Sequence, residues 1–143
     1  MKRQIILGAV TLIILMFFIN TDSFAQTTPT VTVSTNKSSY KAGETGTLII
    51  KFKTAKKVKI PVEPEIEVTL NSSEVEGLGL QPVSSEGGYL KPAQVKYKFK
   101  VSSNVTKGSS VTISGSIKFG YCNEDSGICK IGTKNFSKTI QIK

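Results

Sequence analysis

Two cysteines, Cys122 and Cys129, are the residues of this chain whose type and spacing could do chemistry. They stand in the stretch GYCNEDSGICKIG, residues 120–132, with six residues between them. Such thiols can join in a local disulfide, which either fastens a loop or exchanges with thiols of another protein. The negative charges of Glu124 and Asp125 would raise a thiol pKa. Three nearby lysines would lower it: Lys118, Lys130 and Lys134.

As a purely structural staple, this disulfide would be poorly placed to clamp a whole domain. Closing a loop of eight residues stabilises a fold by about 2.5 kcal/mol in the chain-entropy account. An immunoglobulin framework disulfide instead joins distant strands beside a tryptophan, and this chain has no tryptophan. The pair follows SIKFGY (116–121) and precedes NFSKTIQI (135–142), so we expect it on a connection at one end of the domain. There an incoming thiolate could reach it.

Composition excludes several other kinds of site. The chain has no histidine, which rules out a Ser-His-Asp triad, a Cys-His dyad and histidine metal ligands. Two thiolates are too few for a structural zinc ion, which takes four ligands. A soft-metal carrier would need Met16, which lies in the N-terminal apolar run. We therefore expect no metal and no cofactor.

The N-terminus has the pattern of a secretory signal peptide. Basic residues precede the apolar run Ile5–Phe18, and a small-x-Ala site ends at Ala25. The run is shorter than the roughly 20 residues of a membrane-spanning helix, which disfavours the alternative of an uncleaved anchor. Cleavage after Ala25 would leave residues 26–143 as one exported domain, periplasmic or otherwise extracytoplasmic. Two cysteines in that oxidising compartment are expected to pair.

The exported domain is strongly basic. The 19 basic and 10 acidic residues of the chain lose Lys2, Arg3 and Asp22 with the signal peptide, which leaves 17 and 9. The lysines alternate with other residues, as in KYKFK (96–100), and no arginine remains. This pattern favours a solvated outer face over a surface that binds nucleic acid or anionic lipid.

The rest of the chain predicts an all-β fold. Six segments alternate apolar and polar residues between turn residues: 31–35, 46–54, 65–70, 94–101, 110–119 and 135–142. Gly115 stands in the apolar register of its segment, where a bulge or a close contact is expected. No segment after the signal has a helical period. The pattern indicates an immunoglobulin-like antiparallel β-sandwich.

Residues 71–91 form the least regular long stretch of the sequence. Their serine and glycine content predicts a long loop or a poorly paired edge. Long loops in compact domains are often functional, and a plain connector is the other interpretation.

The signal peptide, the predicted sandwich and the stretch GSIKFGYCNEDSGICKIGTKNFSKTIQI (115–142) together resemble a known family. This is the N-terminal periplasmic domain of the bacterial thiol:disulfide interchange protein DsbD. The family has an aromatic residue followed by the first cysteine, a short loop, the second cysteine and a closing strand. Upstream, KAGETGTLIIKFK, VEPEIEVTL and YLKPAQVKYKFKV also resemble its earlier strands.

The resemblance implies a role in electron transfer. Cys129 would form the mixed disulfide with partners and Cys122 would resolve it. Phe119 would occupy the aromatic position, and Tyr121 or Tyr89 would cover the disulfide, with residues 71–91 as a cap. The implied partners are a thioredoxin-like protein and a membrane thiol–disulfide transporter, here as separate proteins. The resemblance thus favours a protein-disulfide reductase component.

A binding module is the alternative function. A secreted immunoglobulin-like binding or adhesion domain would use the same disulfide only to pin a loop. It would show an exposed apolar patch away from the cysteines, and its binding would survive reduction.

Overall fold

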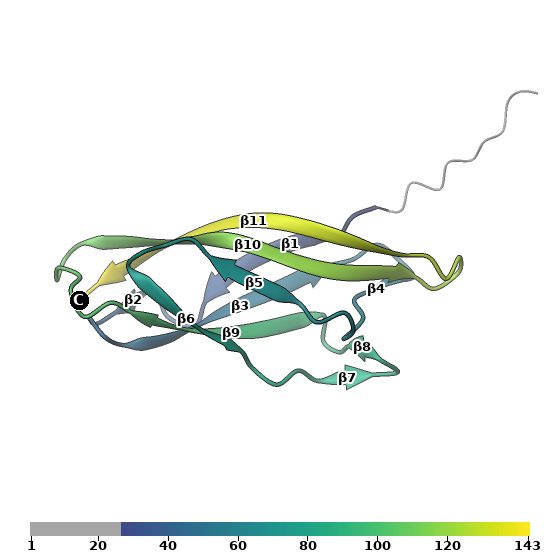
Figure 1. The fold of residues 1–143 in the computed structure, drawn as a ribbon, viewed down its shortest axis with the longest axis horizontal. Coiled ribbons are helices and arrows are strands. Elements are labelled where there is room, and N and C mark those ends of the chain that lie inside the picture. The colour runs from purple at the N-terminus through teal and green to yellow at the C-terminus, as the bar shows by residue number, and fades with distance from the viewer. Residues whose placement is uncertain (1–26) are drawn as a thin grey trace, which may run out of the picture.

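Residues 27–143 are described by the computed structural model, and they form strands and loops without a helix. The predicted signal peptide and its cleavage site after Ala25 lie outside the described residues. Within residues 27–143, no helix has the length and apolar character needed to cross a membrane. The strands make two main sheets packed face to face, which confirms the predicted all-β sandwich (Figure 1).

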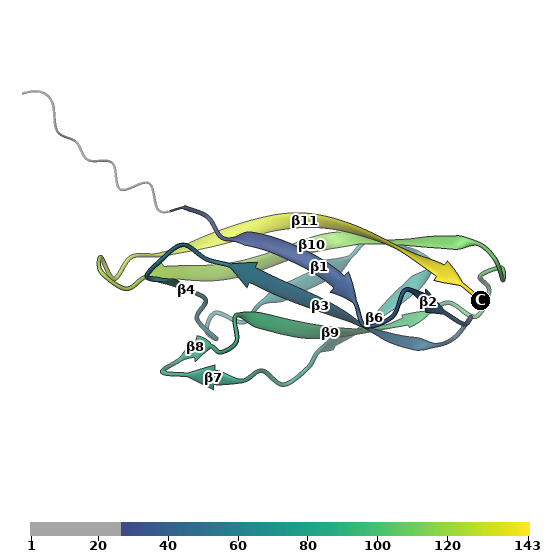
Figure 2. The ribbon, with the colours of Figure 1, turned by 180° about the vertical axis from the view of Figure 1, so that it is seen from behind.

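The first sheet is antiparallel and has four strands. In spatial order they are β1 (Thr30–Thr35), β3 (Thr45–Lys53), β9 (Gln94–Val101) and β6 (Val75–Leu80). In β3 and β9, apolar residues alternate with polar ones, so one side of each strand is buried and the other faces solvent. β1 runs beside β11 and so approaches the second sheet along one side of the sandwich (Figure 2).

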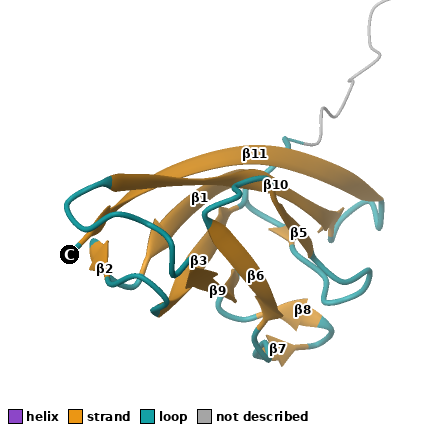
Figure 3. Cartoon of the chain, turned by 60° about the vertical axis from the view of Figure 1, so that its left-hand side comes forward, coloured by secondary structure: helices purple, strands orange, loops and turns teal. Residues whose placement is uncertain are grey.

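The second sheet is built on a long hairpin. Its strands are β2 (Ser39–Tyr40), β11 (Cys129–Ile142), β10 (Ser110–Asn123), β4 (Val58–Lys59) and β5 (Glu67–Leu70). β10 and β11 pair over 13 residues each, β4 and β5 pair with the other edge of β10, and β2 joins β11 in parallel. In Figure 3 this hairpin arches over the first sheet. A separate small hairpin contains β7 (Ser85–Glu86) and β8 (Tyr89–Leu90).

The core between the sheets has two clusters. The cluster at the cysteine end contains Ile50, Phe52, Val58, Ile60, Ile66, Leu90, Val95, Ile117, Phe119 and Tyr121. The cluster at the other end contains Tyr40, Leu48, Val75, Phe99, Val101, Val111, Ile113, Ile140 and Ile142. Residues 27–143 thus have a hydrophobic core of their own between the two sheets.

Gly115 makes the close contact predicted for it. A Cβ atom at this position would lie 2.0 Å from the carbonyl oxygen of Thr69. β5 pairs with β10 here, with Gly115 opposite Leu70. A side chain at Gly115 would therefore push β5 away from the sheet.

Residues 71–91 are more ordered than the prediction of a long loop implied. They contain β6, β7 and β8, and β6 is an edge strand, as the alternative of a poorly paired edge proposed. Its pairing with β9 shifts between Gly77 and Gly79. These two glycines hide the apolar alternation that marks the other strands, so the sequence signal was weak here.

The predicted position of the cysteines on a connection was wrong. β10 continues to Asn123 and β11 begins at Cys129, so both cysteines are strand residues. The apolar–polar alternation did not reveal the end of this strand, because both sides of β10 are buried from Phe119 to Cys122. A strand buried on both sides shows no alternation.

Candidate functional site

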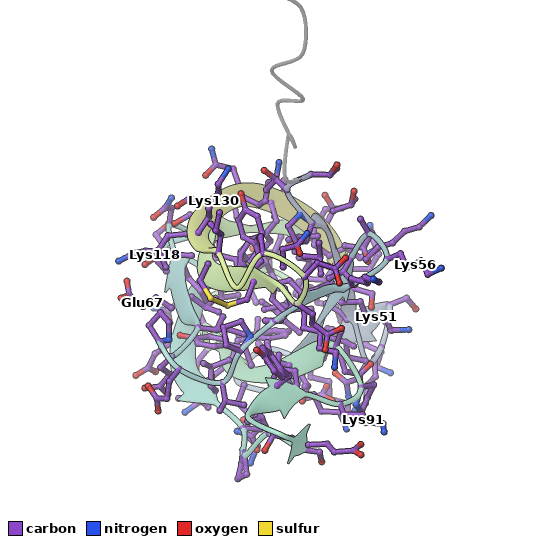
Figure 4. The ribbon with its side chains drawn as sticks, turned by 90° about the vertical axis from the view of Figure 1, so that its right-hand side faces the viewer. Lys51, Lys56, Glu67, Lys91, Lys118 and Lys130 are labelled. Atoms are coloured by element: carbon purple, nitrogen blue, oxygen red, sulfur yellow. A yellow bond between two sulfur atoms is a disulfide. The ribbon has the colours of Figure 1, made fainter. Side chains whose placement is uncertain are left out.

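The candidate site is the disulfide at the tip of the β10–β11 hairpin. Cys122 and Cys129 are directly opposite each other in the register, with their Cα atoms 4.0 Å apart, and they form a disulfide. Figure 4 looks at this end of the sandwich, where the yellow disulfide bond is visible next to the connecting loop. The two thiols that the sequence singled out are thus joined at one exposed end of the domain.

The turn between the cysteines is held by its own hydrogen bonds. The side-chain oxygen of Asn123 accepts hydrogen bonds from the backbone amides of Asp125, at 2.9 Å, and Ser126, at 3.1 Å. The backbone amide of Asn123 donates to the carbonyl of Ile128 at 2.9 Å. Gly127 takes a positive φ of 67°, a backbone conformation that glycine adopts without steric cost. These contacts hold the turn in addition to the disulfide.

The two cysteines differ in exposure. Cys122 is only 5% exposed, whereas Cys129 is exposed to solvent. The difference follows from the position of the two strands, because β10 is an inner strand here and β11 is not. Among the described strands, β2 is the one that pairs with the free side of β11, and it does so only at Gln141 and Ile142, at the far end. The edge of β11 at Cys129 therefore remains accessible.

Cys122 is covered by β4 and the segment that follows it. Lys59 is its partner across the β4–β10 pair, so the two side chains lie on the same face of the sheet. Two residues earlier on that face, a Cβ atom at Gly120 would lie 3.2 Å from Pro61 and 3.4 Å from Pro64. Lys59, Cys122 and Cys129 thus form one row across three strands.

The acidic residues between the cysteines are paired with lysines. The carboxylate of Glu124 lies 2.5 Å from Nζ of Lys59, and that of Asp125 lies 2.7 Å from Nζ of Lys57. The hydrogen bond that Lys59 donates to Glu124 raises the pKa of Lys59, and the one that Lys57 donates to Asp125 raises the pKa of Lys57. The negative charges expected to disfavour a thiolate are therefore offset by positive ones.

The three lysines named from the sequence do not act as a group. Lys118 lies 3.2 Å from a carboxylate oxygen of Glu67 on β5, so its charge is offset. Lys130 and Lys134 are exposed and form no ion pair within residues 27–143. Figure 4 shows Lys118 and Lys130 on one flank of this end of the molecule, and Lys51 and Lys56 on the opposite flank.

Two exposed isoleucines flank the accessible cysteine. Ile128 and Ile131 are each 54% exposed, and they are two of the four large apolar residues exposed in the described structure. Ile131 stands two residues after Cys129 on the same strand, so both side chains lie on the outer face of the sheet. Cys129 therefore has exposed apolar residues beside it, one in the turn and one on its own strand.

The aromatic residues named from the sequence lie on the core side of the hairpin. Phe119 and Tyr121 alternate with Cys122 along β10 and belong to the buried cluster. The ring of Phe119 packs against that of Phe52, with centroids 5.0 Å apart. The hydroxyl groups of Tyr121 and Thr28 lie 3.2 Å apart, within hydrogen-bond distance. These rings therefore support the hairpin from the core side of its sheet.

Tyr89, unlike Phe119 and Tyr121, lies beside Lys59 at the β4 side of the site. Its ring centroid is 5.3 Å from Nζ of Lys59, the residue paired with Cys122. Its backbone forms a bridge with Pro61. Tyr89 and Lys59 also line an open hollow of about 470 Å³ between β4 and the β7–β8 hairpin. The structure thus brings Tyr89 to the strand next to Cys122.

Sequence reasoning missed the contribution of β4. Lys57 and Lys59 were not named, although KKVKI (56–60) carries a short alternation that could have marked β4. The pairing of Lys59 with Glu124 joins residues far apart in the chain, and no local pattern predicts it. Within the described residues, no cluster of histidine, cysteine, aspartate or glutamate could hold a metal ion.

Comparison with known protein families and with curated proteins found no match to this chain.

Proposed function

We propose that this chain is an exported thiol–disulfide exchange module, in which the Cys122–Cys129 pair cycles between disulfide and dithiol. Its partners would be a thioredoxin-like protein and a membrane thiol–disulfide transporter, as in the DsbD N-terminal domain family that the sequence resembles. The difference in exposure carries the proposal. An exchange-active pair needs one sulfur within reach of a partner and a second one held close to it. Cys129 is exposed and Cys122 is buried beside it.

The exchange would begin at the exposed sulfur. A partner thiolate attacks Sγ of Cys129, a new sulfur–sulfur bond forms, and the bond to Cys122 breaks with its electron pair on Cys122. A second thiol of the partner then attacks the partner's own sulfur in the mixed disulfide and releases Cys129. The partner leaves oxidised and this chain leaves reduced by two electrons. In the reverse direction Cys129 attacks a partner disulfide and Cys122 resolves the intermediate.

The hairpin geometry supports a fold that survives in both redox states. Twelve other residue pairs join β10 to β11, and the turn has its own hydrogen bonds. The disulfide closes only a short loop, so its loss removes about 2.5 kcal/mol. A switch must keep its scaffold when it opens, and the hairpin contacts outside the disulfide support that expectation.

We also propose that the sandwich is immunoglobulin-like, and the order of its strands supports this. The first sheet, β1-β3-β9-β6, corresponds to the A-B-E-D order of such domains. In the second sheet, β11 and β10 with β4 and β5 correspond to G, F and C.

The reduction midpoint of residues 26–143 tests the exchange function. Equilibration in thiol–disulfide buffers should give a midpoint in the range of roughly −120 to −270 mV, with the fold retained after reduction. A midpoint below about −300 mV, or unfolding on reduction, would identify a structural staple. Cys122→Ala should trap partners as mixed disulfides through Cys129. Cys129→Ala, the matched control, should trap far less because its remaining thiol is buried.

A binding module is the second candidate, and one observation favours it. Leu78 and Val83 are 46% and 43% exposed, on and just after β6. Val83 lines an apolar groove of about 260 Å³ together with Val62, Ile66, Leu80, Leu90 and Val95. This patch does not include the cysteines. If binding is the function, Leu78→Ser with Val83→Ser will abolish partner capture, and replacing both cysteines by alanine will leave capture unchanged.

A further inference from the structure

The outer face of the β1-β3-β9-β6 sheet carries five exposed lysines. We call it the lysine face, and its lysines are Lys53 and Lys51 on β3 and Lys96, Lys98 and Lys100 on β9. In the register, Ile49 is opposite Lys96 and Lys51 is opposite Gln94. The β3 lysines therefore continue the β9 row diagonally, in a single line. The sequence shows two separate alternating segments, and only the pairing of β3 with β9 joins them.

The line of lysines is long and dense. From Lys53 to Lys100 it advances eight residue positions along the strands, or about 26 Å. Neighbouring lysines are about 7 Å apart, along one strand or diagonally between strands. This spacing is below the Debye length of about 8 Å at physiological ionic strength. Their potentials therefore add up over the face instead of being screened one by one.

These charges are not neutralised by the protein. Within residues 27–143, none of the five lysines takes part in an ion pair. Glu76, opposite Lys100 on β6, is the one acidic residue that the strand pairing places next to them. The outer face of β10 and β11 is different, because its residues are mostly neutral and polar: Thr112, Ser114, Ser116, Thr133, Asn135, Ser137 and Thr139. Five lysines without an ion pair thus stand together on the outer face of this sheet.

We propose that the lysine face docks onto a bilayer that contains anionic lipids. Lysine ammonium groups act as point charges, and such clusters are attracted to anionic headgroups. Recognition of nucleic acid usually adds arginine forks or stacking aromatic rings. Residues 27–143 contain no arginine, and the aromatic residues of β9, Tyr97 and Phe99, alternate with the lysines and pack toward the core. An open sheet face of lysines matches a planar array of negative charges.

Docking through the lysine face would also orient the domain on the bilayer, which goes beyond the proposed exchange function. The lysine row runs along the strands, so docking would lay the long axis of the sandwich along the bilayer. The cysteine side chains lie on the outer face of the other sheet, so docking through the lysine face would leave the disulfide on the side of the sandwich that is turned away from the bilayer.

Vesicle binding tests the proposal. Residues 26–143 are sedimented with vesicles of phosphatidylcholine alone or of phosphatidylcholine with phosphatidylglycerol. Binding should require phosphatidylglycerol and should disappear at high salt. The variant K51Q/K96Q/K98Q should bind on the order of 100-fold more weakly, at about fivefold for each lysine. The control K107Q/K130Q/K134Q removes the same charge from exposed lysines outside the lysine face and should bind nearly as well as the wild type.

Three results would overturn the proposal. One is wild-type protein that does not bind the phosphatidylglycerol vesicles at low salt. Another is equal loss of binding in the two triple variants, which would show attraction by net charge alone. The third is tighter binding to duplex DNA than to the vesicles, with the same dependence on Lys51, Lys96 and Lys98. Matching urea-unfolding midpoints show that both triple variants are folded, and the salt dependence of the wild type needs no variant.

Discussion

At the residue scale, Lys59 is the side chain expected to tune the disulfide. It lies opposite Cys122 and is held by Glu124. A cation beside the leaving sulfur stabilises the thiolate and so favours the reduced form. We expect Lys59→Gln to lower the reduction midpoint by about 30 mV, which corresponds to a tenfold change in equilibrium constant. Glu124→Gln, which frees the lysine charge, should raise the midpoint. Shifts of both variants in the same direction would contradict this role.

Also at the residue scale, the buried Tyr40 makes stability depend on pH. Its hydroxyl donates to Asn36 at 2.8 Å and accepts from the Lys37 amide at 3.1 Å, and burial raises its pKa above 10.0. Folded Tyr40 keeps its proton longer than the unfolded chain does, so stability falls as the pH rises above 10. Tyr40→Phe should cost about 1 kcal/mol at pH 7. In urea unfolding it should lose less stability than the wild type between pH 7 and pH 11, whereas parallel curves would rule Tyr40 out.

At the scale of elements, two glycines of the β10–β11 hairpin should respond differently to a methyl group. Gly115→Ala places Cβ against the Thr69 carbonyl and should destabilise the fold by about 3 kcal/mol as β5 is displaced. At Gly127 no atom lies within 4 Å of the added Cβ, and only the positive φ opposes alanine. Gly127→Ala should cost about 1 to 2 kcal/mol. Urea unfolding of both variants measures the difference, and a larger loss at Gly127 would contradict the packing at β5.

Also at the scale of elements, some strands and pairings could be predicted from the sequence and others could not. β3 and β9 were predicted because each buries one side only, and the alternation of Leu48, Ile50 and Phe52 records it. β4 and β8 have two residues each, so any alternation around them is too short to stand out in the sequence. The disulfide partners were predicted because only two cysteines exist. The pairing of Lys59 with Cys122 could not be predicted, since it depends on the register of strands more than 60 residues apart.

At the scale of the whole molecule, positive charge opposes the compact state. Five of the 17 lysines form ion pairs, which leaves twelve without one in the described structure. Ion pairs on an exposed surface contribute about 1 kcal/mol or less each, so repulsion between the remaining lysines dominates. We expect added sodium chloride to raise the urea-unfolding midpoint of residues 26–143 by screening this repulsion. A midpoint that falls with salt would show that the ion pairs dominate instead.

The two ends of the domain lie at opposite ends of the sandwich. Thr28 is placed next to Tyr121 beneath the cysteine hairpin, whereas Lys143 follows the far end of β11 (Figure 1). A fusion partner or surface attachment at Lys143 would therefore leave the disulfide unobstructed, and one joined before Thr28 would crowd it. Immobilising the domain through its C-terminus is accordingly the way to present the sulfurs to a soluble protein.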